Sequence, residues 1–385
     1  MKALALHAGP AALAHIRAHG LVPSHVAAVP AAAGGPKGLM LLHLDRHLFG
    51  HWLPQAEGPI DLVGASIGAW RLATACLDDP VAGFDALEHH YIHDSYPLRR
   101  AWGRWRLPPP SAISASFAAN LHEIFDGSVD RVLAHPRYRL HVMTSHGRSG
   151  LLAKEGPWRS TLGYLAAYVG NARRREALGQ WVERVVFSAP VVSGGTGADT
   201  GGAEPSPLPF DVRDFPTRQV SLTPASFLPA VQASGSIPFV LEAVHDIPGA
   251  PCGAYWDGGI TDYHLHLRYL QGLSAQPAGT GPARSIVLYP HFQRTLIPGW
   301  FDKAWTRRHA STAALDHVLL LSPRPDWVAH LPHGKLPDRQ DFKRYLGDDA
   351  GRIRAWTQAV AASRQLADEW AHWLEHPDPG QVQPL

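Results

Sequence analysis

Cysteine is scarce in this chain of 385 residues, which contains only Cys76 and Cys252. Two isolated cysteines provide neither a disulfide framework nor a CxxC metal site, and we expect both to be buried, reduced thiols. No stretch approaches the roughly 18 consecutive apolar residues of a membrane-spanning helix. The short apolar run at the N-terminus stops at His7 and is a poor secretory signal. We therefore expect a cytoplasmic protein.

Excess charge of one sign is also missing. The chain has 35 Lys and Arg residues against 33 Asp and Glu residues, a formal net charge of +2. This balance gives no indication of a nucleic-acid partner, and we expect none. With 45% hydrophobic and 18% charged residues, the composition is that of a globular protein and not of a disordered chain or a coiled coil. Nothing in the composition indicates an oligomeric state.

Strand-like and helix-like segments alternate in the first third of the chain. We expect helices at 11–20, 36–50 and 69–77, and strands at 26–29 and 60–63. This order favours parallel βαβ units with right-handed crossovers. Further strands are predicted at 140–144, 185–188, 255–256 and 286–289, and further helices at 114–125 and 225–234.

Two later regions differ in composition. Residues 194–209 are rich in Gly, Ser, Pro and Thr and are typical of a long loop. From Asp349 onward, apolar residues such as Trp356, Val360 and Trp370 recur near helical spacing. This pattern predicts a C-terminal amphipathic helix that packs on the rest of the fold.

Gly64-Ala65-Ser66-Ile67-Gly68 is a GxSxG motif between a predicted strand and a predicted helix. A serine in this context lies on a sharp turn that presents its hydroxyl at the end of the sheet. The positions two before and two after it must be small. Both are glycine here. We infer that Ser66 is a nucleophile; the alternative is a tight structural turn.

Gly34-Gly35-Pro36-Lys37-Gly38 lies between another predicted strand and helix. Backbone N–H groups in such a loop can point at an anion, and the helix N-terminus adds positive potential. Because proline has no N–H, the predicted oxyanion donors are Gly34 and Gly35, assisted by the Lys37 charge. A phosphate-binding loop would need the GxxxxGK[ST] pattern, which is absent. An ordinary helix start is the other alternative.

Tyr255-Trp256-Asp257-Gly258-Gly259 places an acid at the end of a predicted strand, before two glycines that permit a close turn. A carboxylate held within hydrogen-bonding distance of a serine can accept its proton. By itself this tripeptide of Asp and two glycines is most often a turn.

Together, the three motifs resemble the patatin-like phospholipase family in their order and spacing. The segment 233–239 is similar to the Ile-Pro segment that precedes the Asp-Gly-Gly motif in that family, and Ala33 stands where the family's loop has its first glycine. The resemblance implies a three-layer α/β/α fold with a mainly parallel central sheet. It also implies a Ser66–Asp257 dyad without metal or cofactor, acting on a lipid or other acyl ester. It covers 26–262, within an expected catalytic domain of 1–330. The remainder, 331–385, is expected to be a helical extension packed on that domain.

Other functions are compatible with the same residues. A Ser–Asp–His triad could use His264, His266 or His291, which all follow Asp257 in the chain. His264 and His266 could also face a metal, but a third ligand is lacking. An acyltransferase would use the same dyad, and a catalytically silent lipid-binding protein would need none of the motifs.

Two clusters combine tryptophan with basic residues, at 99–106 and at 300–308. Such a composition suits a surface that touches lipid headgroups, because Trp favours the membrane interface and Arg binds phosphate. The clusters could equally be loops packed over the fold or walls of an acyl-chain pocket. Peripheral membrane contact is therefore one expectation for this chain.

Overall fold

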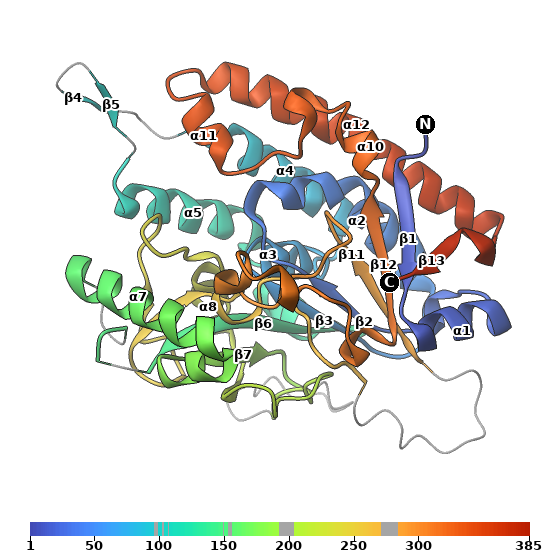
Figure 1. Cartoon of the computed structure of the whole chain (residues 1–385), viewed down its shortest axis with the longest axis horizontal. Coiled ribbons are helices and arrows are strands. Elements are labelled where there is room, and N and C mark those ends of the chain that lie inside the picture. The colour runs from blue at the N-terminus through green and yellow to red at the C-terminus, as the bar shows by residue number, and fades with distance from the viewer. Residues whose placement is uncertain are drawn as a thin grey trace.

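The computed structural model describes the greater part of the chain (Figure 1): residues 1–95, 99–101, 104–106, 108–148, 150–152, 156–191, 204–270 and 284–385. Most of the predicted loop at 194–209 lies outside these residues. So do the side chains of the first Trp-basic cluster.

A mainly parallel sheet of eleven strands runs through the described part of the molecule. Its strands follow in the spatial order β13 (Val382–Pro384), β1 (Leu4–Ala8), β12 (Val318–Pro323), β11 (Ile286–Pro290), β2 (Val26–Ala31), β3 (Ile60–Ala65), β6 (Tyr138–Gly147), β10 (Ala254–Asp257) and β9 (Val244–His245). Strand β7 (Val182–Ser188) also pairs with β6, and β8 (Thr217–Ser221) pairs with β7. A separate hairpin of β4 (Arg99–Ala101) and β5 (Arg104–Arg106) projects from one end of the molecule (Figure 1).

The strand register brings three chain segments to one place. Strands β2 and β3 are parallel, with Ala31 opposite Gly64, so the loops that follow them leave the same edge. Strand β6 is parallel to β3 and continues past its end, with Met143 opposite Ala65. Strand β10 returns antiparallel along β6 and ends with Asp257 opposite Thr144. The ends of β2, β3 and β10 therefore converge.

Helices cover one face of the sheet. They are α2 (Leu42–His47), α3 (Ile67–Thr74), α4 (Pro80–His93), α5 (Pro110–Phe125), α8 (Pro224–Gly235) and α12 (Asp349–Glu375). Because successive strand residues point to opposite faces, Ile286 and Leu288 of β11 pack with these helices, whereas Val287 and Tyr289 pack on the other face. Apart from α7 (Pro157–Arg173), the remaining helices of the described residues are α1 (Pro10–His19), α6 (Val129–Leu133), α9 (Gly259–Asp262), α10 (Pro325–Val328) and α11 (Gln340–Arg344).

The second face of the sheet has a different covering. Much of it lies under segments without long helices, including Leu265, Tyr269 and Phe292. Toward β10 it is covered by α7 (Pro157–Arg173), which packs through Tyr164 and Ala167. The fold is thus a mixed α/β structure with elements on both faces of the sheet.

Most predicted elements are confirmed. The strands at 26–29, 60–63, 140–144, 185–188, 255–256 and 286–289 and the helices at 11–20, 69–77, 114–125 and 225–234 are all present, and α12 is the predicted C-terminal helix. The helix expected at 36–50 is instead a 3₁₀ helix (Gly35–Leu41), α2 and a π turn (Leu48–Trp52). Glycine and proline in its first turn disfavour a regular α-helix.

The C-terminal residues 331–385 are joined closely to the rest of the fold. Strand β13 extends the sheet in parallel to β1, and the amide groups of Ala3 and Leu4 donate to the carboxylate of Glu369 on α12. Among the described residues, no helix is both long and apolar enough to cross a membrane.

The prediction that both cysteines are buried is correct for Cys76 and wrong for Cys252, which is exposed. Cys252 lies in a turn before β10 and not in an element of the core.

Candidate active site

Ser66 lies on the sharp turn between β3 and α3. Its backbone has φ +56° and ψ −129°, a strained conformation for a residue with a side chain. A Cβ at Gly64 would lie 2.4 Å from the Cα of Ala69, and one at Gly68 would lie 1.9 Å from the carbonyl oxygen of Ala31. Neither position can hold a side chain without backbone movement. The motif is therefore a nucleophile elbow in its geometry.

Asp257, at the end of β10, is hydrogen-bonded directly to the serine. The Ser66 hydroxyl donates to Oδ2 of Asp257 at 2.7 Å, and the Gly259 amide donates to Oδ1 at 2.7 Å. The residues of this pair are 191 positions apart in the chain. The carboxylate is thus fixed by its own turn and aimed at the serine.

Ser234, on α8, holds the elbow from the other side. Its hydroxyl accepts a hydrogen bond from the Ser66 amide at 2.9 Å and donates to the carbonyl oxygen of Met143 on β6 at 2.7 Å. All of these groups are buried. Ser234 therefore links the nucleophile turn to the strand beside Asp257.

The two glycines after Asp257 allow its turn to pack closely. A Cβ at Gly258 would lie 2.2 Å from the Met143 carbonyl oxygen, and one at Gly259 would lie 2.7 Å from the Cβ of Ala33. The Ala33 methyl group, which occupies the first position of the glycine loop, thus packs against a glycine that leaves room for it.

The glycine loop lies beside Ser66. Gly35 is buried, has φ +57° and lines the same cavity as Ser66. As the first residue of a 3₁₀ helix, it has no intrahelical acceptor for its N–H. Gly34 precedes it and lies against the ring of Phe292, while Gly38 packs against Ile67 at the start of α3. The elements needed for an oxyanion hole are therefore adjacent to the serine.

Lys37 is placed differently from its sequence neighbours. Its ammonium lies 5.1 Å from the centre of the Phe292 ring, and it does not line the cavity that contains Ser66. Burial lowers the pKa of Lys37. Its charge can act on the site only at a distance, beside the backbone donors of Gly34 and Gly35.

Arg339, which the sequence did not single out, does line this cavity. It is half-buried, and its side chain packs against Gly35. The Arg339 Nε atom lies 3.1 Å from the position that a Cβ on Gly35 would take. Among the described residues, no carboxylate forms an ion pair with it. Arg339 follows Asp257 by dozens of residues in a segment without a motif, so no local pattern could have indicated it.

Burial and cations act in opposite directions on Asp257. Only 6% of the side chain is exposed, and desolvation raises the pKa of Asp257 above its ordinary value. Arg339, the hydrogen bonds from Ser66 and Gly259, and Lys303 each lower it in part. The net shift is upward, which makes this carboxylate a stronger base than an exposed one.

Lys303 is a second basic residue near the dyad that sequence reasoning used only as part of a Trp-basic cluster. Its side chain is exposed in part, but its ammonium lies 3.9 Å from the centre of the Tyr263 ring. Desolvation there, together with the charges of Arg339 and Lys37, lowers the pKa of Lys303 to about 7.

A cavity of about 430 Å³ opens beside Ser66, a size typical of small-molecule sites. Its polar groups include Ser66, Tyr91 and Arg339. Most of its wall is apolar, formed by residues such as Ile67, Trp70, Ile113, Phe117, Ile237 and Leu241. The Ser66 hydroxyl therefore faces a cavity whose wall would accommodate an apolar group.

The three histidines considered for a triad have other partners. His264 Nδ1 accepts a hydrogen bond from the Ile297 amide at 3.0 Å, and His266 Nε2 is hydrogen-bonded to the Thr312 hydroxyl at 2.9 Å. His291 Nδ1 is hydrogen-bonded to the backbone of Gln293. Among the described residues, the Ser66 hydroxyl donates its hydrogen bond to Asp257 and not to any of these histidines.

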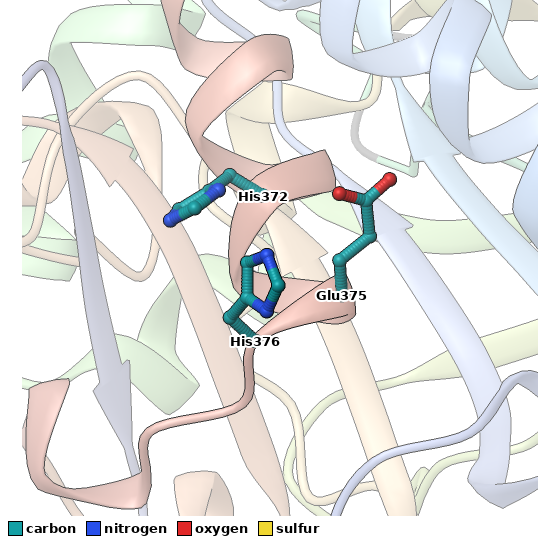
Figure 2. Close-up of side chains that lie close together, drawn as sticks. All are labelled: His372, Glu375 and His376. Atoms are coloured by element: carbon teal, nitrogen blue, oxygen red, sulfur yellow. The ribbon is translucent and has the colours of Figure 1, made fainter.

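Figure 2 shows a cluster of His372, Glu375 and His376 at the end of α12. Their nearest ligand atoms lie within 4.8 Å of one another, but all three side chains are exposed. These residues lie one helical turn apart, so their proximity follows from helix geometry. Nothing further in the described structure points to a metal there.

The second Trp-basic cluster, at 300–308, is partly buried. Trp300 and Phe301 pack against the core cluster under α7, and Arg308 donates to Asp302 at 2.6 Å.

In comparisons with known proteins, no family model matches the chain, and no curated protein is significantly similar to it.

Proposed function

We propose that this protein is a serine acyl hydrolase that acts on lipid acyl esters through a Ser66–Asp257 dyad. The observation that carries the proposal is the 2.7 Å hydrogen bond from the Ser66 hydroxyl to Asp257 on a strained elbow. Three features support it: the glycine loop beside the serine, the apolar cavity and the mixed α/β fold. These are the features that the resemblance to patatin-like phospholipases implies.

In this mechanism Asp257 accepts the Ser66 proton while the serine oxygen attacks the ester carbonyl. The N–H groups of Gly34 and Gly35 stabilise the oxyanion of the tetrahedral intermediate, and Arg339 adds positive potential beside Gly35. Collapse of the intermediate transfers the proton to the departing alcohol and leaves an acyl ester on Ser66. Asp257 then takes a proton from water, which attacks the acyl group. Collapse of this second intermediate releases the acid and returns the proton to the Ser66 oxygen.

The proposal is tested by hydrolysis of p-nitrophenyl esters with acyl chains from C2 to C16. Wild type is compared with Ser66→Ala and Asp257→Asn. We expect each variant to lose about 10⁴-fold in kcat, as when the acid of a serine triad is neutralised. The preferred chain length reports the size of the acyl pocket.

Activity that survives in Asp257→Asn would show that another group is the base. A variant of His264 to Gln serves as the matched control, because His264 is buried near the site but has its own backbone partner. Addition of an alcohol acceptor distinguishes hydrolysis from acyl transfer, since a transferase would yield the new ester.

A further inference from the structure

Helix α7 carries apolar side chains on its outward face. Trp158, Leu162, Leu165 and Val169 follow one another at helical spacing, and their side chains are 80%, 54%, 58% and 43% exposed. The inward face of the same helix is also apolar, with Tyr164 and Ala167 in the core. A surface helix normally has a polar outer face. The exposed residues therefore form an unusual surface, here called the α7 apolar face.

Helix α7 also packs against an exposed residue of the cavity wall. Phe239 and Val240, exposed by 58% and 40%, line the cavity that contains Ser66. The Phe239 ring packs against Tyr164 of α7 with their centres 5.6 Å apart. Phe239 also has φ +68°, a strained conformation for a residue with a side chain. Helix α7, with its exposed apolar face, is thus in contact with the wall of the cavity that contains Ser66.

We propose that the α7 apolar face, with Phe239 and Val240, docks this protein on a lipid surface. This proposal rests on the proposed function, and it identifies the surface from which the acyl ester would enter the cavity. A lipid surface at this place would let an acyl chain pass directly over Phe239 into the cavity. A second protein copy would instead cover the cavity mouth. Figure 1 shows α7 on the outer rim of the molecule, free of other described elements on its outer side.

Charges around this face indicate which lipid surface it fits. The sequence of α7 contains no acidic residue and ends at Arg173, next to Arg174, both exposed. Glu176 follows them and is exposed as well. These exposed charges follow Val169, the last residue of the α7 apolar face, so apolar insertion and not electrostatic attraction would drive docking. Trp158 suits the headgroup region, where indole rings are favoured.

The docking test uses the Ser66→Ala protein in every arm, so that vesicles are not hydrolysed. Flotation with phosphatidylcholine vesicles measures the bound fraction against lipid concentration, at low and at high salt. We expect binding that persists at high salt. The double variant Leu162→Gln, Leu165→Gln should bind at least about tenfold more weakly, given the apolar area withdrawn from lipid.

Val169→Gln and Val22→Gln form a matched pair, because these valines are 43% and 46% exposed. Val169 lies on α7, whereas Val22 follows α1, which Figure 1 shows on the opposite side of the molecule. We expect Val169→Gln to weaken binding and Val22→Gln to leave it unchanged. This single-residue comparison stands even if the double variant does not fold, which its thermal unfolding reports.

Absence of vesicle binding, or equal binding by the Val169 and Val22 variants, would overturn the proposal. The proposal would also be overturned if light scattering gave the mass of a dimer for the protein and the mass of a monomer for the Leu162→Gln, Leu165→Gln variant. A second copy of the chain would then cover the α7 apolar face. Catalysis is tested separately, by wild-type hydrolysis of a soluble short-chain ester. Failure of docking is thereby distinguished from failure of the proposed function.

Discussion

Replacing Gly68 with alanine should move Ser66 away from Gly34 and Gly35, which we propose as its oxyanion donors. A methyl group there would lie 1.9 Å from the Ala31 carbonyl oxygen, whereas ordinary contact begins at 3.4 Å. The start of α3 and the end of β2 would have to move apart by about 1.5 Å, the difference between these distances. Strand β2 leads directly into Gly34 and Gly35, so their N–H groups would move away from Ser66.

The expected loss follows from this displacement. A misplacement of about 1 Å in an active site can cost about 10²-fold in rate, and overpacking typically costs about 1–3 kcal/mol of stability. We therefore expect kcat/KM for a soluble p-nitrophenyl ester to fall at least about 10²-fold. The unfolding midpoint should fall by a few degrees.

Gly170→Ala is the matched control for this variant. A methyl group at Gly170 would meet its nearest atom at 3.6 Å, an ordinary contact, and alanine favours the helix that contains it. We expect wild-type turnover and an unchanged or higher unfolding midpoint. If Gly68→Ala keeps wild-type turnover and stability, the close packing that we assign to the elbow would be refuted.

Three further predictions concern the groups around the dyad. Burial raises the pKa of Asp257 in the folded protein, so the stability that protonated Asp257 provides is present below its ordinary pKa and is lost as pH rises through the raised pKa. Asn resembles the protonated carboxyl, so Asp257→Asn should unfold at a higher temperature than wild type at pH 7, with a smaller difference near pH 4. Arg339 lowers the pKa of Asp257, so Arg339→Gln should move the acidic limb of the kcat/KM profile to higher pH, while Arg339→Lys should restore it in part; an unmoved limb would contradict this role. Ser234→Ala leaves the Ser66 amide and the Met143 carbonyl without their side-chain partner and should lower the free energy of unfolding by about 1–3 kcal/mol, measured by denaturant titration.

Sequence patterns were sufficient where the signal is local. The strand before Ser66 and the helix after it follow from an apolar run, a glycine-rich turn and a helical stretch. The amphipathic spacing of Trp356 and Trp370 likewise predicted α12. Strand β8 is largely polar and β13 has three residues, so neither carries a pattern of its own. Helix α7 was missed because it is apolar on both its faces, which weakens the helical periodicity.

The candidate site divides in the same way. Ser66, Asp257 and the glycine loop could be named because the chemistry needs particular residue types in motifs. Arg339 and Lys303 reach the site through folding of the last third of the chain. Arg339 lies in a polar segment without a motif, and the Trp-basic cluster that contains Lys303 did not indicate that Lys303 would lie near Asp257. Lys37 was predicted from its place in the motif, but its side chain turns toward Phe292. Side-chain direction is set by tertiary packing, which motif spacing does not contain.

The most direct measurement of the central claim is mass spectrometry of the protein after reaction with a fluorophosphonate, an ester-like probe that phosphonylates activated serines. The account predicts one covalent adduct, on the peptide that contains Ser66. It should be absent in Ser66→Ala and form much more slowly in Asp257→Asn. No adduct on Ser66 in the wild type, or equal rates in wild type and Asp257→Asn, would contradict a nucleophile activated by the 2.7 Å hydrogen bond to Asp257.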